Sequence, residues 1–104
     1  MSKDIVFSGV QPTGEIHLGN YLGAIKQFLN FQNECDSIFC IVDQHAITIF
    51  QDPNELKENV LSVLAIFLAS GLDPKKCIIF NQASVREHSG LSWYLRCTAR
   101  VGWL

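Results

Sequence analysis

The 104 residues contain little that would mark a disordered, secreted or membrane-spanning protein. Only three residues are Pro and 48% are hydrophobic, which excludes a disordered tail, because such tails have too little apolar content to offset chain entropy. No apolar run reaches the 18 residues that a membrane-spanning helix needs, and the N-terminus lacks the features of a signal peptide. Eight Lys and Arg against ten Asp and Glu give a net charge of −2, so the chain lacks the bulk positive charge that holds nucleic acid.

The cysteines follow no metal-binding or disulfide pattern. They are Cys35, Cys40, Cys77 and Cys97. This spacing matches no zinc motif and no CxxC motif, which predicts reduced thiols in a cytoplasmic protein. The three histidines, His17, His45 and His88, are too scattered in sequence to indicate a metal cluster, so we predict no protein-bound metal.

The hydrophobic pattern alternates between short apolar runs and longer segments of helical period. The runs at 5–7, 38–42 and 77–80 are continuous rather than alternating, which is typical of strands buried on both faces of a parallel sheet. The segments at 19–34, 53–70 and 87–100 have helical periodicity. The order β-α-β-α-β-α predicts an α/β, Rossmann-like parallel sheet with flanking helices in a single domain.

The ends of the second helix are marked by residues with specific conformational preferences. Asp52 suits the N-cap, Pro53 the first helical position, and Glu55 falls three residues after the cap. Gly71 is placed to end the helix in a left-handed conformation.

The segment 8–20 is the most informative part of the sequence. It joins the first strand to the first helix, where open α/β sheets bind ligands and where a helix N-terminus favours phosphate. Its glycines allow close backbone approach, and His17 and Asn20 offer hydrogen-bond donors. Neither GxxxxGK[ST] nor GxGxxG occurs, so the segment is neither a P-loop nor a dinucleotide fingerprint.

The stretch His17-Leu18-Gly19-Asn20 resembles the His-Ile-Gly-His signature of class I aminoacyl-tRNA synthetases. The flanks 7–14 and 21–24, and the later stretches 40–48, 51–53, 71–74 and 85–88, resemble the bacterial tryptophanyl-tRNA synthetases in particular. The resemblance covers essentially all 104 residues. Leu18 replaces Ile with little change in volume, and Asn20 replaces the second His, as is common in the tryptophan enzymes but not in the tyrosine enzymes.

The resemblance implies a function and a set of site residues. It implies ATP-dependent activation of tryptophan to the adenylate, with Mg²⁺, followed by transfer to tRNA(Trp) by a cytoplasmic enzyme that is a homodimer at full length and does not bind a membrane. The implied catalytic residues are His17 and Asn20. The implied ATP-binding residues are Gln11, Pro12, Thr13, His17, Gly19 and Asn20, and the implied tryptophan-binding residues are Phe7, Gly9, Val42 and His45.

Several of these residues also have a purely structural interpretation. Asp43 and His45 follow a strand, so a turn-capping Asp and a hydrogen-bonded His are real alternatives. His88 is better explained as part of a helix start than as a ligand. Arg96 and Arg100 lie four residues apart on a helix, which favours a solvated face over an RNA contact.

Three parts of the family enzyme do not occur within these residues: the Lys-Met-Ser-Lys-Ser loop, the later Asp that reads the indole N–H, and the anticodon-binding domain. We therefore expect residues 1–104 to form the N-terminal part of a nucleotide-binding catalytic domain, inactive or very weak in isolation. The alternatives are a non-catalytic adenine-nucleotide-binding module and a tyrosine-type synthetase.

Overall fold

The computed structural model describes residues 3–13 and 21–103. Its elements are β1 (Ile5–Val10), a π-helical turn η1 (Tyr21–Ile25), α2 (Lys26–Glu34), β2 (Asp36–Ile41), α3 (Asp43–Ala46), α4 (Pro53–Ala69), β3 (Cys77–Asn81), a 3₁₀ turn η2 (Gln82–Ser84), α5 (Arg86–Thr98) and a 3₁₀ turn η3 (Val101–Trp103). The three strands and the helices after each of them confirm the predicted order. The short α3 and the 3₁₀ turns were not predicted, and the start of the first helix at 19–20 lies outside the described residues.

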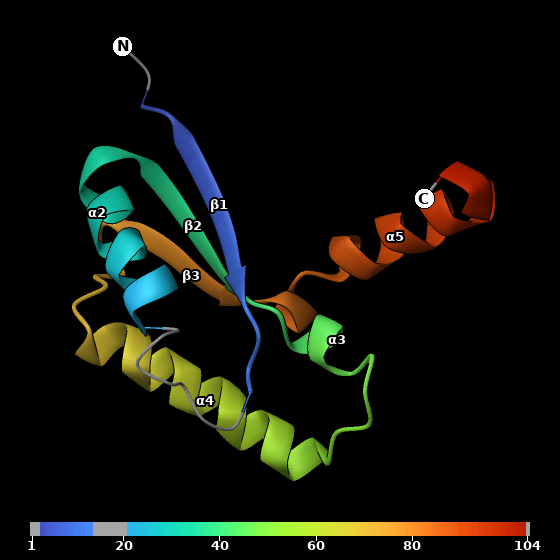
Figure 1. Ribbon diagram of the computed structural model, residues 1–104, viewed down its shortest axis with the longest axis horizontal. Helices are drawn as coiled ribbons and strands as arrows, with labels where there is room; N and C mark the ends of the chain where they lie inside the picture. Colours follow the sequence, from blue (N-terminus) through green and yellow to red (C-terminus); the bar gives the residue numbers. More distant parts are fainter. Residues whose placement is uncertain (1–2, 14–20, 104) are drawn as a thin grey trace.

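The three strands form one parallel sheet in the order β1-β2-β3 (Figure 1). Ile5 of β1 pairs with Asp36 of β2 and Val10 with Ile41, while β2 pairs with β3 from Ser37 opposite Cys77 to Ile41 opposite Asn81. Because all three strands run in one direction, their carboxyl ends lie at a single edge of the sheet. The α/β, Rossmann-like fold predicted from the sequence is therefore confirmed.

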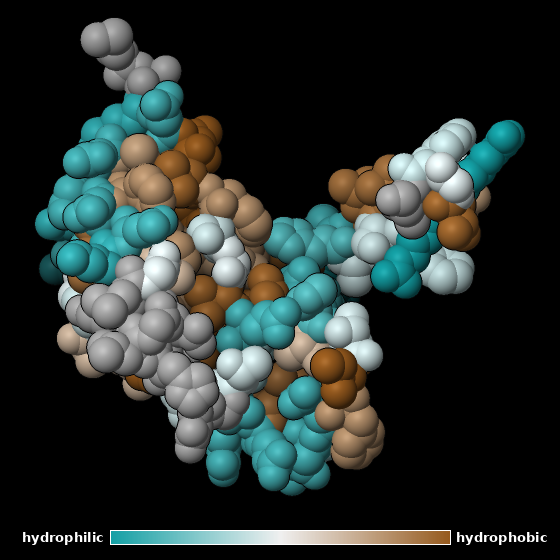
Figure 2. All heavy atoms as spheres, viewed as in Figure 1, coloured by the Kyte–Doolittle hydropathy of each residue, from teal (hydrophilic) through white to brown (hydrophobic). Residues whose placement is uncertain are grey.

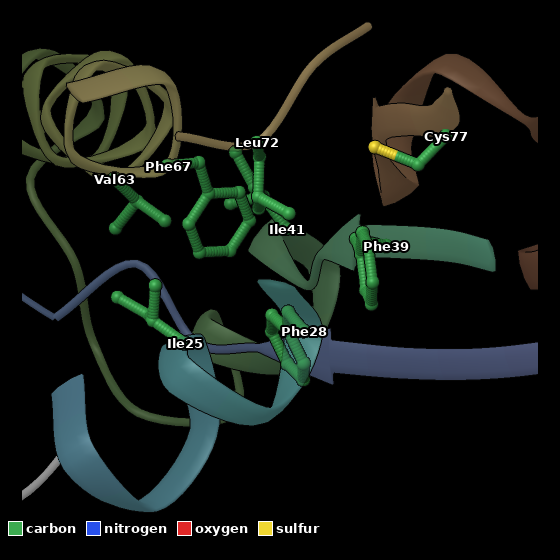
Figure 3. Packing of buried hydrophobic residues seen from close by; sticks show 8 residues of the cluster. All are labelled: Ile25, Phe28, Phe39, Ile41, Val63, Phe67, Leu72 and Cys77. Carbon is green, nitrogen blue, oxygen red and sulfur yellow. The ribbon is translucent and has the colours of Figure 1, made fainter. Parts of the chain in front are cut away.

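One face of the sheet is covered by α2 and α4, and the hydrophobic core lies between these helices and the sheet (Figure 3). Phe28 of α2 stacks on Phe39 of β2, with ring centroids 4.4 Å apart. Phe67 of α4 meets Phe28 edge to face at 6.0 Å. Full burial of a Phe side chain contributes roughly 1.5–3 kcal/mol, so these rings account for much of the packing energy.

The other face of the sheet is open, which corrects the prediction that all three strands are buried on both faces. Ile5 and Phe7 of β1 are 74% and 59% exposed, and Ile78 of β3 is 59% exposed. Only β2, in the middle of the sheet, is buried along most of its length. Because consecutive side chains point to opposite faces, a continuous apolar run specifies two apolar faces but not that both are covered within these residues.

The predicted ends of α4 are confirmed. The carboxylate of Asp52 accepts hydrogen bonds from the backbone N–H groups of Asn54 and Glu55, at 2.9 and 3.1 Å. Gly71 follows the helix with a backbone φ of 108°, a value that residues with a β-carbon rarely adopt.

The last helix, α5, extends away from the sheet as an arm (Figure 1), and none of its residues is buried. Apolar residues such as Leu91, Trp93 and Leu95 reach its surface, and Figure 2 shows brown residues along this arm. The radius of gyration is accordingly 15.2 Å, compared with about 13 Å for a compact chain of this length. Within the part of the chain that the structure describes, no helix is both long and apolar enough to cross a membrane.

Candidate functional site

The carboxyl edge of the sheet gathers the segments that the sequence marked for ligand binding. β1 leads into Gln11–Thr13, β2 into Val42 and Asp43, and β3 into η2. Figure 1 shows the ends of the three strands meeting beside α3. Parallel strands therefore bring segments that are about 30 to 70 residues apart in sequence to one place.

The first predicted ATP-binding segment leaves β1 as a tight turn. The N–H of Thr13 donates to the carbonyl of Gln11 at 2.9 Å. Pro12 is fully buried, while Gln11 and Thr13 are exposed. A buried proline between two exposed polar residues fixes the backbone and leaves both side chains free to meet a ligand. The other predicted ATP-binding and catalytic residues, His17, Gly19 and Asn20, lie outside the described residues and stay predictions.

Three of the four predicted tryptophan-binding residues come together at the end of β1. Phe7 and Gly9 share the open face of the sheet, since they are two residues apart on one strand. A β-carbon at Gly9 would lie 2.9 Å from Cγ1 of Val42, so these two residues touch. Val42 is also joined to β1 by a 2.9 Å hydrogen bond from its N–H to the carbonyl of Val10.

Aromatic side chains line the open face beside these residues and form an aromatic wall of Phe7 on β1 and Phe80 on β3. The ring of Phe7 lies 6.4 Å from that of Phe80, and the imidazole of His88 meets Phe80 edge-on at 5.7 Å. Phe80 was not singled out from the sequence, although its position at the end of the third strand was a usable signal. His88 lies in the first turn of α5 and packs on Phe80, which agrees with its interpretation as part of a helix start.

The fourth predicted residue, His45, lies on α3 rather than on the sheet. Its backbone N–H donates to Oε1 of Gln82 at 3.1 Å, and its carbonyl accepts from the hydroxyl of Thr48 at 2.9 Å. Its side chain is exposed and lines an open hollow of about 380 Å³ together with His88 and Arg96. His88 therefore links the aromatic wall at Phe80 to the hollow that His45 faces.

The remaining candidate residues, Asp43, Arg96 and Arg100, lie in or near the turn after β2 and on or after α5. Asp43 is buried and accepts hydrogen bonds from the backbone N–H groups of Gln44 and Ala83, which agrees with its structural interpretation. Arg96 lines the hollow, and the guanidinium of Arg100 lies 5.6 Å from the ring centroid of Trp103. Within residues 3–13 and 21–103, no group of three or more His, Cys, Asp or Glu is placed to hold a metal ion.

The thiol of Cys40 lies at the same edge, beside Asp43. Burial raises the pKa of Cys40 above its ordinary value of 9.0, and the negative charge of Asp43 raises that pKa further. The thiol is therefore protonated at neutral pH and packs as a small apolar group.

Comparison with known proteins gives one consistent family. The family described as "tRNA synthetases class I (W and Y)" matches residues 2–104. A tryptophan–tRNA ligase of Brucella melitensis is 54% identical over 102 residues, which are 98% of this chain and 29% of that protein. One from Prochlorococcus marinus is 52% identical over 104 residues, all of this chain and 31% of that protein.

The fold leads to the same family. The crystal structure of tryptophanyl-tRNA synthetase from Campylobacter jejuni complexed with ADP and tryptophan is similar with a TM-score of 0.88 and 40% identity. That similarity covers 94% of this chain and 31% of the Campylobacter chain. The chain thus spans about 30% of the length of the relatives it matches. Its sequence, from residue 2 to the last, and its parallel sheet together establish that the chain belongs to the class I tRNA synthetases of the tryptophan and tyrosine type.

Proposed function

We propose that these residues form the amino-acid and ATP-binding part of a tryptophan–tRNA ligase. The observation that carries this proposal is the contact between Gly9 and Val42, on the same open face of the sheet as the exposed Phe7 and at the point where β1 leads into Gln11. Gly9 and Gln11 are two residues apart, which is about 7 Å along an extended chain. An amino acid held at Gly9 would therefore have its carboxylate within reach of a nucleotide held at Gln11.

The proposed reaction is an in-line attack of the tryptophan carboxylate on the α-phosphorus of ATP. A bond forms between a carboxylate oxygen of tryptophan and the α-phosphorus. The bond from the α-phosphorus to the oxygen that bridges it to the β-phosphorus breaks, and pyrophosphate leaves together with Mg²⁺. The chain's contribution would be positioning and hydrogen-bond donation toward the phosphate charge. Gln11–Thr13, Gly19 and Asn20 would hold ATP, and His17 would donate to the phosphates.

The proposal extends to the second step and to the partners. The adenylate would transfer tryptophan to the terminal ribose of tRNA(Trp), in the cytoplasm, and the full-length enzyme would act as a homodimer. The Campylobacter relative in complex with ADP and tryptophan supports the two small ligands. The identity of the Brucella and Prochlorococcus relatives as tryptophan–tRNA ligases supports tryptophan over tyrosine.

The test is tryptophan-dependent exchange of pyrophosphate into ATP, measured on the natural polypeptide that carries these 104 residues. We expect exchange with tryptophan to exceed exchange with tyrosine, and both His17→Ala and Gly19→Val to reduce it. Gly90→Ala is the matched control for the glycine, because a β-carbon at Gly90 meets no atom within 4 Å. Exchange that depends on tyrosine, or no exchange in the parent, would contradict the proposal.

The isolated 104-residue chain provides a second comparison. It lacks the Lys-Met-Ser-Lys-Ser loop of the family. A helix N-terminus alone stabilises an anion by only about 0.3–2 kcal/mol, whereas enzymatic acceleration requires the barrier to fall by roughly 8 kcal/mol or more. We therefore expect it to be a very weak catalyst. ATP binding without exchange would fit the non-catalytic alternative for this isolated chain, and full-length-like turnover would contradict our assignment of the chemistry.

A further inference from the structure

Asp43 carries the one buried charged side chain within the described residues, with 9% of its surface exposed. It is the first residue of α3, directly after Val42, and His45 follows two residues later. A carboxylate taken out of water must be compensated by hydrogen bonds, since an unpaired buried charge is strongly destabilising. The partners of Asp43 therefore indicate what its burial achieves.

The carboxylate of Asp43 accepts three hydrogen bonds, two of them from a distant part of the chain. Oδ1 accepts from the backbone N–H groups of Gln44 at 3.0 Å and Ala83 at 2.9 Å. Oδ2 accepts from the side-chain amide of Asn81 at 2.9 Å. Asn81 in turn accepts through its Oδ1 from the hydroxyl of Ser84. One side chain therefore joins the turn after β2 to the turn after β3.

A second link runs beside the first and reaches a predicted ligand-binding residue. The N–H of His45 donates to Oε1 of Gln82, which lies between Asn81 and Ala83. The position of His45 thus depends on the position of η2. Asp43 holds η2 in place, because it binds Asn81 and Ala83, the residues on either side of Gln82. Val42, on the other side of Asp43, is held against β1 by its bond to Val10.

We propose that Asp43 is a positioning residue for the bound amino acid. Its carboxylate sets the distance between the ends of β2 and β3, and thereby the places of Val42 and His45 at the tryptophan site. This inference rests on the proposed function. A purely structural role would instead confine the effect of Asp43 to the free energy of unfolding.

An exchange of the two side chains tests the proposal. In Asp43→Asn, the new amide oxygen can still accept from Gln44 and Ala83, but the new NH₂ group faces the NH₂ group of Asn81. A bond between the two side chains then requires the Asn81 amide to rotate and turn its NH₂ group toward the hydroxyl of Ser84. Adding Asn81→Asp restores an acceptor opposite that NH₂ group, and Asp at position 81 still accepts from Ser84. The double variant therefore recovers every hydrogen bond of the network with the two groups interchanged.

The measurement is tryptophan-dependent exchange in the natural polypeptide, with KM determined separately for tryptophan and ATP. We expect Asp43→Asn to raise the KM for tryptophan by about tenfold or more and that for ATP by less than about twofold, with most of the loss recovered in the double variant. The matched control is Asp52→Asn at the start of α4. It replaces by a neutral amide another carboxylate that accepts two backbone hydrogen bonds. The proposal is wrong if Asp52→Asn raises the KM for tryptophan equally. It is also wrong if Asp43→Asn lowers stability but leaves the KM for tryptophan unchanged.

A second readout keeps this inference separate from the proposed function. Hydrogen exchange at the His45 amide reports the position of α3 whether or not the protein uses tryptophan. We expect faster exchange in Asp43→Asn and recovery in the double variant, with α4 unchanged. An unchanged His45 amide would overturn the inference, whereas an inactive parent would overturn only the proposed function. Asn81→Ala removes one of the three donors and replaces Asp43→Asn if that variant does not fold.

Discussion

Gly9 and Val42 approach each other so closely that a β-carbon on Gly9 would stand 2.9 Å from Cγ1 of Val42 and 3.6 Å from the carbonyl oxygen of Cys40. The first distance is shorter than ordinary carbon–carbon contact. The β-branched side chain of Val42 has little rotamer freedom with which to move away. The missing side chain at Gly9 therefore lets β1 and the end of β2 meet at the predicted tryptophan site.

We predict that Gly9→Ala destabilises the protein by about 1–3 kcal/mol, as overpacking does in other tightly packed sites. The measurement is the free energy of unfolding by urea denaturation. Gly90→Ala, in the middle of α5, is the control, because the added methyl group meets no atom within 4 Å and Ala favours helix by about 0.5–1 kcal/mol. Equal effects of the two substitutions would contradict the importance of the Gly9–Val42 contact.

A second prediction concerns Gln32, a buried polar residue of α2 that fixes the chain after α4. Its Nε2 donates to the carbonyl of Gly71 at 3.1 Å, and its Oε1 accepts from the N–H of Asp73 at 2.9 Å. Gln32→Glu keeps the acceptor but loses the donor, so the Gly71 carbonyl faces a carboxylate. We expect a loss of about 1–3 kcal/mol, measured by thermal or urea denaturation at neutral pH.

The pH dependence provides the check on this substitution. Protonation of the new carboxyl group restores a donor toward Gly71, so the loss should shrink as the pH falls through the titration of that group. Gln27→Glu is the matched control, because it makes the same chemical change at an exposed position of α2. A loss at Gln27 as large as that at Gln32 would show that added negative charge on α2, rather than the buried bridge, causes the effect.

The sequence predicted the strands and helices well where local signals agree. Asp52, Pro53 and Gly71 specify the ends of α4 through capping and a positive φ, and the structure has both features. The family resemblance implied that Gly9 and Val42 belong to one site, but their contact was not predicted, because no local signal relates a residue of β1 to one that follows β2.

Other features depend on tertiary structure and could not be predicted. The apolar run 5–7 was interpreted as buried on both faces, yet Ile5 and Phe7 are exposed, because coverage depends on what packs against a face. Whether Asp43 acts as a ligand or as a cap depended on Asn81 and Ala83, about 40 residues away. The places of His17, Gly19 and Asn20 stay sequence-based predictions.

A third prediction concerns the relative reactivity of the thiols. Burial raises the pKa of both Cys40 and Cys77, and the neighbouring charges of Asp43 and Asp73 add to the respective shifts. Cys97 is exposed on α5. Since the thiolate is the reactive form, iodoacetamide at about pH 8 should modify Cys97 well before Cys40 or Cys77 in the native protein. Mass spectrometry of timed samples measures this order, and the same reaction in urea, where all four thiols should react at similar rates, is the control.

The raised thiol pKa values also predict how stability changes in alkali. A thiol whose pKa is higher in the folded than in the unfolded state keeps its proton longer when folded, so the folded protein binds more protons above pH 9.0. The stabilising contribution is therefore complete below the unfolded pKa near 9.0 and is lost as the pH rises through the folded pKa.

Urea denaturation between about pH 8 and pH 11 should show a falling free energy of unfolding. Cys40→Ala combined with Cys77→Ala should flatten that fall, whereas Cys97→Ala should leave it unchanged, because Cys97 is exposed. A fall that is equally steep in the double variant would mean that groups other than the buried thiols cause the alkaline loss.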